Sequence, residues 1–214
     1  MVVGDVMVKK PITIKEHCSL KQAQELMVKN SIRHLPVVEG SKLLGVITES
    51  DIRGAFIPNH SKSKPKEEPN WDPEKMEVGD YMTSDPLVVY PETHVEDAAL
   101  IIYKNKIGAL PVLKSRKLVG VISILDMLGL FIDLMGIIHS SSRVDVVMGK
   151  SPENFDKASN IIHEQNVNII SVSMAPVQDD KNKRVYSFRL ELCDTKVVVK
   201  ALKKAGFKVA AAIE

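Results

Sequence analysis

Two hydroxyl–carboxylate pairs with identical spacing are the residues of this chain best suited to binding a ligand. Thr48 precedes Asp51 by three positions in GVITESD, and Ser123 precedes Asp126 by three positions in GVISILD. The hydroxyl can form a hydrogen bond with a phosphate or ribose oxygen, and the carboxylate can accept hydrogen bonds from both hydroxyls of a ribose diol. This combination suits a nucleoside phosphate.

Each of these heptapeptides is expected to run from a strand into a helix. The first turn of a helix presents unpaired backbone N–H groups and the positive end of the helix dipole, which favours an anion such as phosphate. Ser, Thr and Asp are also the preferred residues at helix N-caps. Capping is therefore the alternative role of the four side chains, and the two roles are compatible.

The two heptapeptides belong to a long internal repeat. Residues 3–56 align with residues 78–131 at a constant offset of 75 positions without a gap, and 20 of the 54 aligned residues are identical. A repeat of this length indicates two copies of one structural unit. One such unit has too small a core to be stable alone, so the two units are expected to pack sheet against sheet.

The elements predicted for each unit follow the order β-α-β-β-α. An extended segment after a proline is followed by a helix, two short apolar strands and a final helix. Ser19 with Gln22, and Thr93 with Glu96, are predicted to form capping boxes at the first helix of each unit. The predicted strands are 35–38 and 43–47 in the first unit and 110–113 and 118–122 in the second, and the final helices begin near Asp51 and Asp126.

Residues 1–138 resemble a tandem pair of CBS domains, a Bateman module. The specific marks are the strings IRHLPVV and IGALPVL, each followed in the same register by Gly-hydrophobic-x-Ser/Thr-x-x-Asp. The resemblance implies CBS domains at 1–57 and 78–139, joined by a linker at 58–77 that contains four prolines. It also implies AMP, ADP, ATP or another adenosyl compound as ligand, with no required cofactor.

The same resemblance implies which residues bind the ligand. The Ser/Thr and Asp of each motif would contact phosphate or ribose, and the adenine would lie beside the first extended segment of a unit. In some nucleotide-binding members a basic residue three positions before the strand proline contacts phosphate, and Arg33 matches that position. The implied binding residues are Ile12, Thr13, Arg33, His34, Thr48, Asp51, Arg53, Leu87, Val88, Ser123 and Asp126.

The two predicted clefts differ in charge. The first motif is accompanied by three basic or titratable residues whose equivalents in the second unit are neutral. We therefore expect the first cleft to accept a charged nucleotide, and the second to accept a less charged adenosine compound or nothing. A solvated side chain is the alternative for Arg33. The pairs of equivalent residues are Arg33 and Gly108, His34 and Ala109, and Arg53 and Leu128.

Residues 140–214 are predicted to form a separate ferredoxin-like domain with the order βαββαβ. The strands are predicted at 143–148, 168–175, 184–192 and 207–212, and the helices at 152–165 and from Thr195 to a C-terminal Gly206. In the third strand, Tyr186, Phe188, Leu190 and Leu192 alternate on one face. This order resembles an ACT domain, a family that commonly binds amino acids at a dimer interface. The loop at 148–154 lacks the usual D-x-P-G, so amino-acid binding and dimerisation alone both stay open.

Over its whole length the chain resembles the acetoin-utilisation AcuB-type proteins. That resemblance implies a regulatory role in acetoin or related carbon catabolism. No nucleophile elbow, glycine-rich dinucleotide loop or metal-binding histidine spacing occurs. We therefore expect a non-catalytic sensor without a metal. The alternatives are a structural or dimerisation adaptor with empty clefts, or the regulatory subunit of an unidentified enzyme.

Composition limits the partners and the location. A formal net charge of +2 gives no broad reason to expect nucleic acid or an acidic membrane as partner. The most apolar stretch, 127–138, is shorter than the roughly 20 residues of a spanning helix. The N-terminus has no signal-peptide pattern, and Cys18 and Cys193 have no motif spacing, so a reduced cytoplasmic protein is expected. The apolar helix of 127–138 predicts a homodimer or higher assembly.

Overall fold

The computed structural model describes residues 1–56, 72–138, 140–177 and 180–213. The chain divides into two compact units, Met1–Met127 and Leu128–Glu214. Most of the linker, including Trp71, lies outside the described residues. Among the helices that are described, none has both the length and the apolar character required to cross a membrane.

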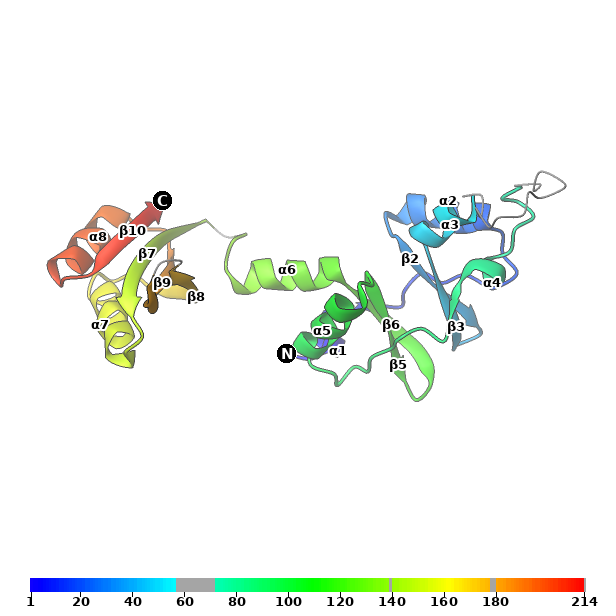
Figure 1. Cartoon of the computed structure of the whole chain (residues 1–214), viewed down its shortest axis with the longest axis horizontal. Coiled ribbons are helices and arrows are strands. Elements are labelled where there is room, and N and C mark those ends of the chain that lie inside the picture. The colour runs from blue at the N-terminus through cyan, green and yellow to red at the C-terminus, as the bar shows by residue number, and fades with distance from the viewer. Residues whose placement is uncertain (57–71, 139, 178–179, 214) are drawn as a thin grey trace. The chain divides into compact units, whose positions relative to one another are not determined.

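The first unit contains two three-stranded sheets, with strand orders β2-β3-β4 and β1-β6-β5 (Figure 1). This mixed α/β architecture, with the two repeats packed as a pair, confirms the predicted fold class, and the four predicted apolar strands lie within β2, β3, β5 and β6. Its elements are α1 (Val3–Val6), β1 (Val8–Lys9), α2 (Leu20–Asn30), β2 (His34–Glu39), β3 (Lys42–Thr48), α3 (Glu49–Ala55), α4 (Val78–Tyr81), β4 (Thr83–Ser84), α5 (Val95–Asn105), β5 (Ala109–Lys114) and β6 (Lys117–Ser123). The next helix, α6 (Ile124–Leu134), begins in this unit and continues into the second.

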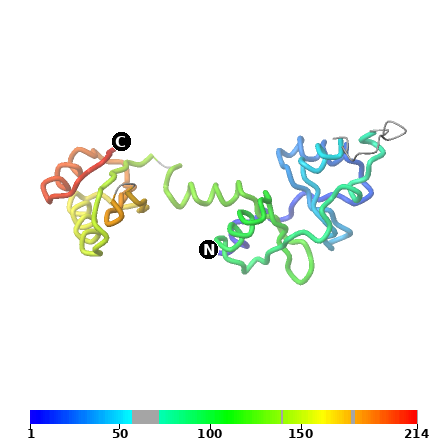
Figure 2. Tube along the Cα trace, in the orientation of Figure 1, coloured from blue at the N-terminus to red at the C-terminus, as the bar shows by residue number. Residues whose placement is uncertain are grey.

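The two repeats exchange the segments with which they begin. β1 pairs antiparallel with β6 of the second repeat, and β4 pairs antiparallel with β3 of the first. Val3 is fully buried in the core of the second repeat, and Val78 is fully buried in the core of the first. In Figure 2 the blue N-terminal trace accordingly runs beside the green trace of the second repeat, where the Val3 amide donates to Thr93 O at 2.8 Å. Each repeat therefore completes its core with a segment of the other.

The opening strands lie before the prolines, and not after them as the sequence predicts. β1 and β4 end just before Lys10 and Asp85, whose φ angles are +53° and +49°. These left-handed residues turn the chain, and the proline that follows has no N–H to donate to a strand ladder. Beyond the proline, extended pairing is reduced to one parallel bridge in each repeat, such as Ile14 with Val37.

One of the two predicted capping boxes is present. Ser19 caps α2, because its hydroxyl accepts from the Gln22 amide at 3.2 Å while Gln22 Oε1 accepts from the Ser19 amide at 3.0 Å. The prediction for Thr93 and Glu96 is wrong. The N-cap of α5 is His94, which is the repeat equivalent of Ser19, and the Thr93 hydroxyl instead accepts from the Tyr90 amide in the preceding turn.

The second unit is a four-stranded antiparallel sheet with strand order β10-β7-β9-β8. Its element order, βαββαβ, confirms the predicted ferredoxin-like arrangement. Gly206 stands just past the C-terminal end of α8 with a φ of +90°, the left-handed conformation that commonly ends a helix. Leu192 does not continue the inward row of Tyr186, Phe188 and Leu190, because β9 ends at Glu191 and the Leu192 side chain is exposed. The elements are β7 (Ser141–Gly149), α7 (Pro152–His163), β8 (Ile169–Val177), β9 (Asp180–Glu191), α8 (Thr195–Lys204) and β10 (Lys208–Ile213).

Candidate functional site

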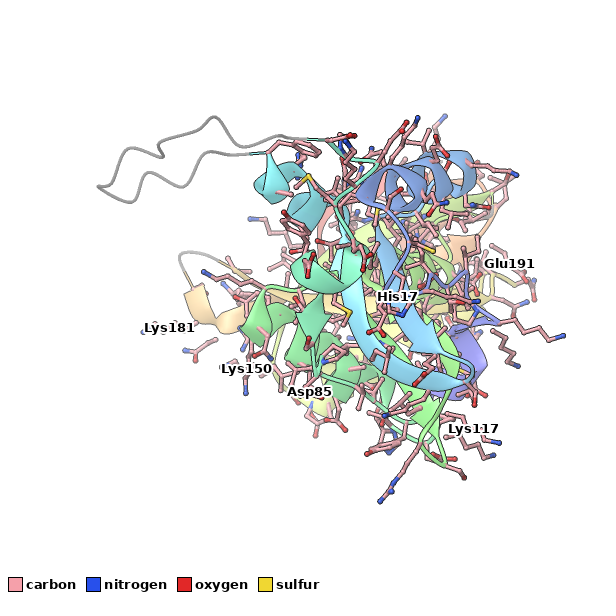
Figure 3. All side chains as sticks on the ribbon, turned by 90° about the vertical axis from the view of Figure 1, so that its right-hand side faces the viewer. His17, Asp85, Lys117, Lys150, Lys181 and Glu191 are labelled. Atoms are coloured by element: carbon pink, nitrogen blue, oxygen red, sulfur yellow. The ribbon has the colours of Figure 1, made fainter. Side chains whose placement is uncertain are left out.

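A cavity of about 690 Å³ opens between the two repeats of the first unit. Residues of the first repeat line one side, and the segment after β4 together with the α5–β5 junction lines the other. Its wall includes Asp85, which is labelled in Figure 3, and Leu87 two positions later. The implied binding residues that the structure gathers here are Arg33, His34, Thr48, Asp51, Arg53 and Leu87.

The other five implied residues do not line this cavity. Ile12 and Thr13 follow β1, which pairs with the second repeat, so the exchange of opening segments associates them with the second motif. Val88 adjoins Leu87 but is not part of the wall. Ser123 and Asp126 begin α6 in the second repeat. The sequence alone could not decide which extended segment accompanies which motif, because that depends on the pairing of two-residue strands.

Thr48 and Asp51 form a complete capping box at α3. The Asp51 amide donates to Thr48 Oγ1 at 3.2 Å, and Asp51 Oδ2 accepts from the Thr48 amide at 2.8 Å and from the Thr48 hydroxyl at 2.7 Å. Within the described parts of the chain, Asp51 Oδ1 accepts no hydrogen bond. The carboxylate therefore caps the helix with one oxygen and retains the other for a donor in the cavity.

The second motif repeats this arrangement. Asp126 Oδ2 accepts from the Ser123 amide at 2.8 Å and from the Ser123 hydroxyl at 2.6 Å. The Asp126 amide donates back to Ser123 Oγ at 3.3 Å. The capping role considered from sequence is thus real at both motifs, and only the first motif also faces the cavity described above.

The basic side chains of the cavity are weakly engaged within the protein. Arg33 is 80% exposed, and its Nε lies 3.7 Å from Glu49 Oε2, which is longer than a good hydrogen bond. Arg53 donates to the hydroxyl of Ser50 at 3.2 Å and pairs with no carboxylate among the residues that the structure describes. Neither guanidinium group forms a short hydrogen bond to a carboxylate, so both can contact an anionic ligand.

His34 explains a difference between the repeats. The half-buried imidazole lies against Gly108, and a Cβ atom added to Gly108 would stand only 2.5 Å from His34 Cε1. Gly108 is the repeat equivalent of Arg33, so the second repeat has no room for a basic side chain there while His34 occupies that space. Burial lowers the pKa of His34, and the charge of Arg33 lowers it further while Asp51 partly opposes them.

The side of the cavity formed by the α5–β5 junction was not among the binding residues predicted from sequence. Asn105, Lys106, Ile107 and Gly108 line the cavity, as do Asp85 and Pro86 after β4. The repeat offset carried a usable signal, since 105–108 are the equivalents of 30–33. Two equivalent loops related by an approximate twofold axis are expected to face each other, and the contact of His34 with Gly108 shows that they do. The described residues contain no group of three or more His, Cys, Asp or Glu side chains placed to hold a metal ion.

A family profile now decides the classification. The CBS domain profile matches residues 3–57 and 78–133, which are the two repeats. The chain belongs to the CBS domain family. Its pair of CBS repeats accounts for the exchanged strands and for a cavity between two equivalent loops.

Relatives with known names share this part of the chain. The chain is 30% identical over 154 residues to protein MJ1232 of Methanocaldococcus jannaschii, an alignment that covers 72% of this chain and 42% of that protein. It is 31% identical over 178 residues to inosine-5'-monophosphate dehydrogenase of Aquifex aeolicus, covering 79% of this chain and 32% of the enzyme. The chain thus spans less than half the length of these relatives.

Solved structures of CBS proteins superpose on about three fifths of the chain. AcuB from Vibrio cholerae is 30% identical with a TM-score of 0.53, covering 64% of this chain and 94% of AcuB. The CBS domain pair of protein MJ0100 was solved with 5'-methylthioadenosine and S-adenosyl-L-methionine. It is 28% identical with a TM-score of 0.52, and the match covers 61% of this chain and 95% of that domain pair. CBSX2 in complex with AMP is 28% identical with a TM-score of 0.52, and the match covers 62% of this chain and 96% of CBSX2.

Proposed function

We propose that this protein is a non-catalytic regulator that senses an adenine nucleotide or nucleoside through the cavity between its CBS repeats. The observation that carries the proposal is the cavity itself, which gathers Thr48, Asp51 and the basic residues of the first motif opposite Leu87. In this proposal Asp51 holds the ribose diol, Arg33 contacts phosphate and the adenine lies against Leu87. AMP, S-adenosyl-L-methionine and 5'-methylthioadenosine are ligands of the similar CBS proteins, which supports an adenosyl ligand here.

The second motif is proposed as a weaker site. Ser123 and Asp126, with Ile12 and Thr13, would accept an uncharged adenosine compound or remain empty, because apolar Ile124 and Leu125 stand inside the motif. Val88 would contribute to the apolar surroundings of the first site through its neighbour Leu87.

The second unit is proposed to be an ACT-like domain. Its four-stranded sheet and two helices have the required order, and its role is either dimerisation or amino-acid binding. The likeness to AcuB supports a role in acetoin or related carbon catabolism. A cytoplasmic homodimer is part of the same proposal, and the exposed apolar side chains of α6 support the dimer. The likeness to part of a dehydrogenase favours, as second candidate, a regulatory subunit that binds an enzyme.

A thermal-shift screen tests the proposal. A ligand that binds only the native state raises stability by RT ln(1 + [L]/Kd). We expect adenosine, AMP, ADP, ATP or S-adenosylmethionine to raise the melting temperature in a concentration-dependent manner, whereas guanosine and cytidine should not. No shift with any adenosyl compound would favour the adaptor, and turnover of ATP would show an enzyme.

A further inference from the structure

The wall of the cavity contains a cation that the second repeat supplies. Lys106 follows α5 and lines the cavity together with Arg33 and Arg53 of the first repeat. The Lys106 side chain forms no ion pair or hydrogen bond with any residue that the structure describes. An ammonium group beside a cavity without a protein partner is available to an anionic ligand group.

The three cations of this cavity are absent from their equivalent positions in the other repeat. The repeat equivalents of Arg33, Arg53 and Lys106 are Gly108, Leu128 and Ser31, none of which is charged. The first cavity therefore combines two guanidinium groups from one repeat with an ammonium group from the other, beside the carboxylates of Glu49, Asp51 and Asp85. Other wall positions differ in the opposite sense, because Asp85, Gly108 and Ala109 are equivalent to Lys10, Arg33 and His34. The two motifs therefore differ in where their cations stand.

The backbone at Lys106 keeps this residue at a fixed place in the wall. Lys106 is the C-cap of α5 in the left-handed region, with φ +54° and ψ +36°, and its amide donates to Ile102 O. Its repeat equivalent Ser31 has the same conformation, so the turn is dictated by the fold and the lysine side chain is not needed to form it. The turn therefore does not require a lysine at position 106, and the side chain is available for contact with a ligand.

We propose that Lys106 clamps the anionic substituent at the 5′ end of an adenosyl ligand from the second repeat, opposite Arg33 and Arg53. This inference rests on the proposed function and adds the residue that selects charged over uncharged adenosyl compounds. The shared chemistry is an anionic tail, either a phosphate chain or the carboxylate of an amino-acid tail. Asp85 is also in the wall and has no ion-pair or hydrogen-bond partner among the described residues, so it would accept hydrogen bonds from the amine of such an amino-acid tail.

The experiment measures the affinities of the full chain for adenosine, 5'-methylthioadenosine, AMP, ATP and S-adenosylmethionine by calorimetry. Lys106→Met should leave the affinities for adenosine and 5'-methylthioadenosine unchanged. It should lower the affinities for the ligands with an anionic tail by roughly tenfold or more. Weakening of AMP and ATP identifies a phosphate tail, and weakening of S-adenosylmethionine identifies a carboxylate. Lys104→Met is the matched control, since Lys104 is exposed on the last turn of the same helix and does not line the cavity.

A second variant separates a binding role from a structural one. Lys106→Gly should maintain or raise the melting temperature, because glycine favours a positive φ at the end of a helix, yet it should weaken the same charged ligands as Lys106→Met. Equal affinities in wild type and both variants, or equal weakening of every ligand including adenosine, would overturn the proposal. If wild type fails to bind adenosine and all its derivatives, the proposed function itself fails, which is a different result.

Discussion

Asp51 has two roles that a substitution would remove together. Its Oδ2 closes the capping box with Thr48, and its Oδ1 is the proposed acceptor for the ribose diol. We predict that Asp51→Ala weakens adenosine, AMP and ATP alike by about ten- to hundredfold, since charge-assisted hydrogen bonds are worth roughly 1.5–3 kcal/mol. Loss of the capping box should also lower the free energy of unfolding by about 1 kcal/mol.

Asp126→Ala is the matched control for this prediction. It removes the equivalent capping box at α6 but no residue of the first cavity, so nucleotide affinity should remain close to wild type. Arg33→Ala, by contrast, should weaken AMP and ATP far more than adenosine. Unchanged nucleotide affinity in Asp51→Ala, measured by calorimetry, would show that Asp51 only caps its helix, and the adaptor would become the better account.

His34 gives the first unit a dependence on pH. Because its pKa is lowered in the folded state, the native protein binds fewer protons than the unfolded chain as pH falls below the usual histidine pKa of about 6.5. The contribution of neutral His34 to the free energy of unfolding is therefore fully present above that pH. It is lost as the pH falls toward the lowered pKa. We predict that His34→Gln flattens the fall in unfolding free energy between about pH 7.5 and pH 5, measured with urea. An identical slope in wild type and variant would contradict this.

At the scale of elements, the exchanged strands depend on two glycines. A Cβ atom at Gly45 would stand 2.7 Å from Thr83 O in β4 and 2.6 Å from Met82 Sδ, and Gly120 is equally close to the sulfur of Met7 and near Val8 O in β1. These glycines allow β3 and β6 to approach the segment that each receives from the other repeat. A side chain at either position would push the exchanged strand away.

We predict that Gly45→Ala lowers the free energy of unfolding by about 1–3 kcal/mol, because the nearest atoms include backbone that cannot rotate away. It should also lower the affinity of the first cavity for its ligand, because β4 leads directly into Leu87. Gly54→Ala is the control, since nothing lies within 4 Å of its added Cβ and alanine favours α3. Urea unfolding checks both variants, and a stable Gly45→Ala with normal ligand affinity would show that β4 tolerates displacement.

The elements that local patterns determine could be predicted, and those that depend on distant pairing could not. The repeat period and alternation identified β2, β3, β5 and β6, and the caps Ser19 and Gly206 were identified from residues beside them. Two-residue strands such as β1 and β4 carry no periodicity, so their exchange escaped the sequence analysis. The first motif with its basic residues was therefore predicted as a site, whereas Lys106 and the assignment of Leu87 to that site required the structure.

At the scale of the whole molecule, α6 gives the reason to expect assembly. No residue of α6 is fully buried, and its exposed side chains include Leu125 at 73% and Phe131 at 56%. We predict a homodimer of twice 23.7 kDa by light scattering at micromolar concentration. Leu125→Glu with Phe131→Glu should produce monomers, because charges at an apolar interface are not compensated.

Val28→Glu is the control for assembly. Val28 is 70% exposed on α2 of the first repeat, so its replacement should leave the dimer intact if α6 forms the contact. A wild-type protein that remains a monomer of 23.7 kDa would refute the prediction. Dissociation by Val28→Glu alone would place the contact on the first repeat.

The exchange of opening segments has a consequence for the order in which the chain acquires its structure during synthesis. When residue 56 leaves the ribosome, the first repeat is complete as sequence but still lacks Val78 in its core and β4 in its sheet. Residues 3–9 must meanwhile wait, unpaired, until β6 has been made. β4 completes the first sheet once residue 84 has been made, and β6 completes the second sheet later. Neither repeat alone is therefore an independent folding unit. A chimera that takes one repeat from a related protein must therefore also take that protein's opening segment of the other repeat, because this segment completes the transplanted core.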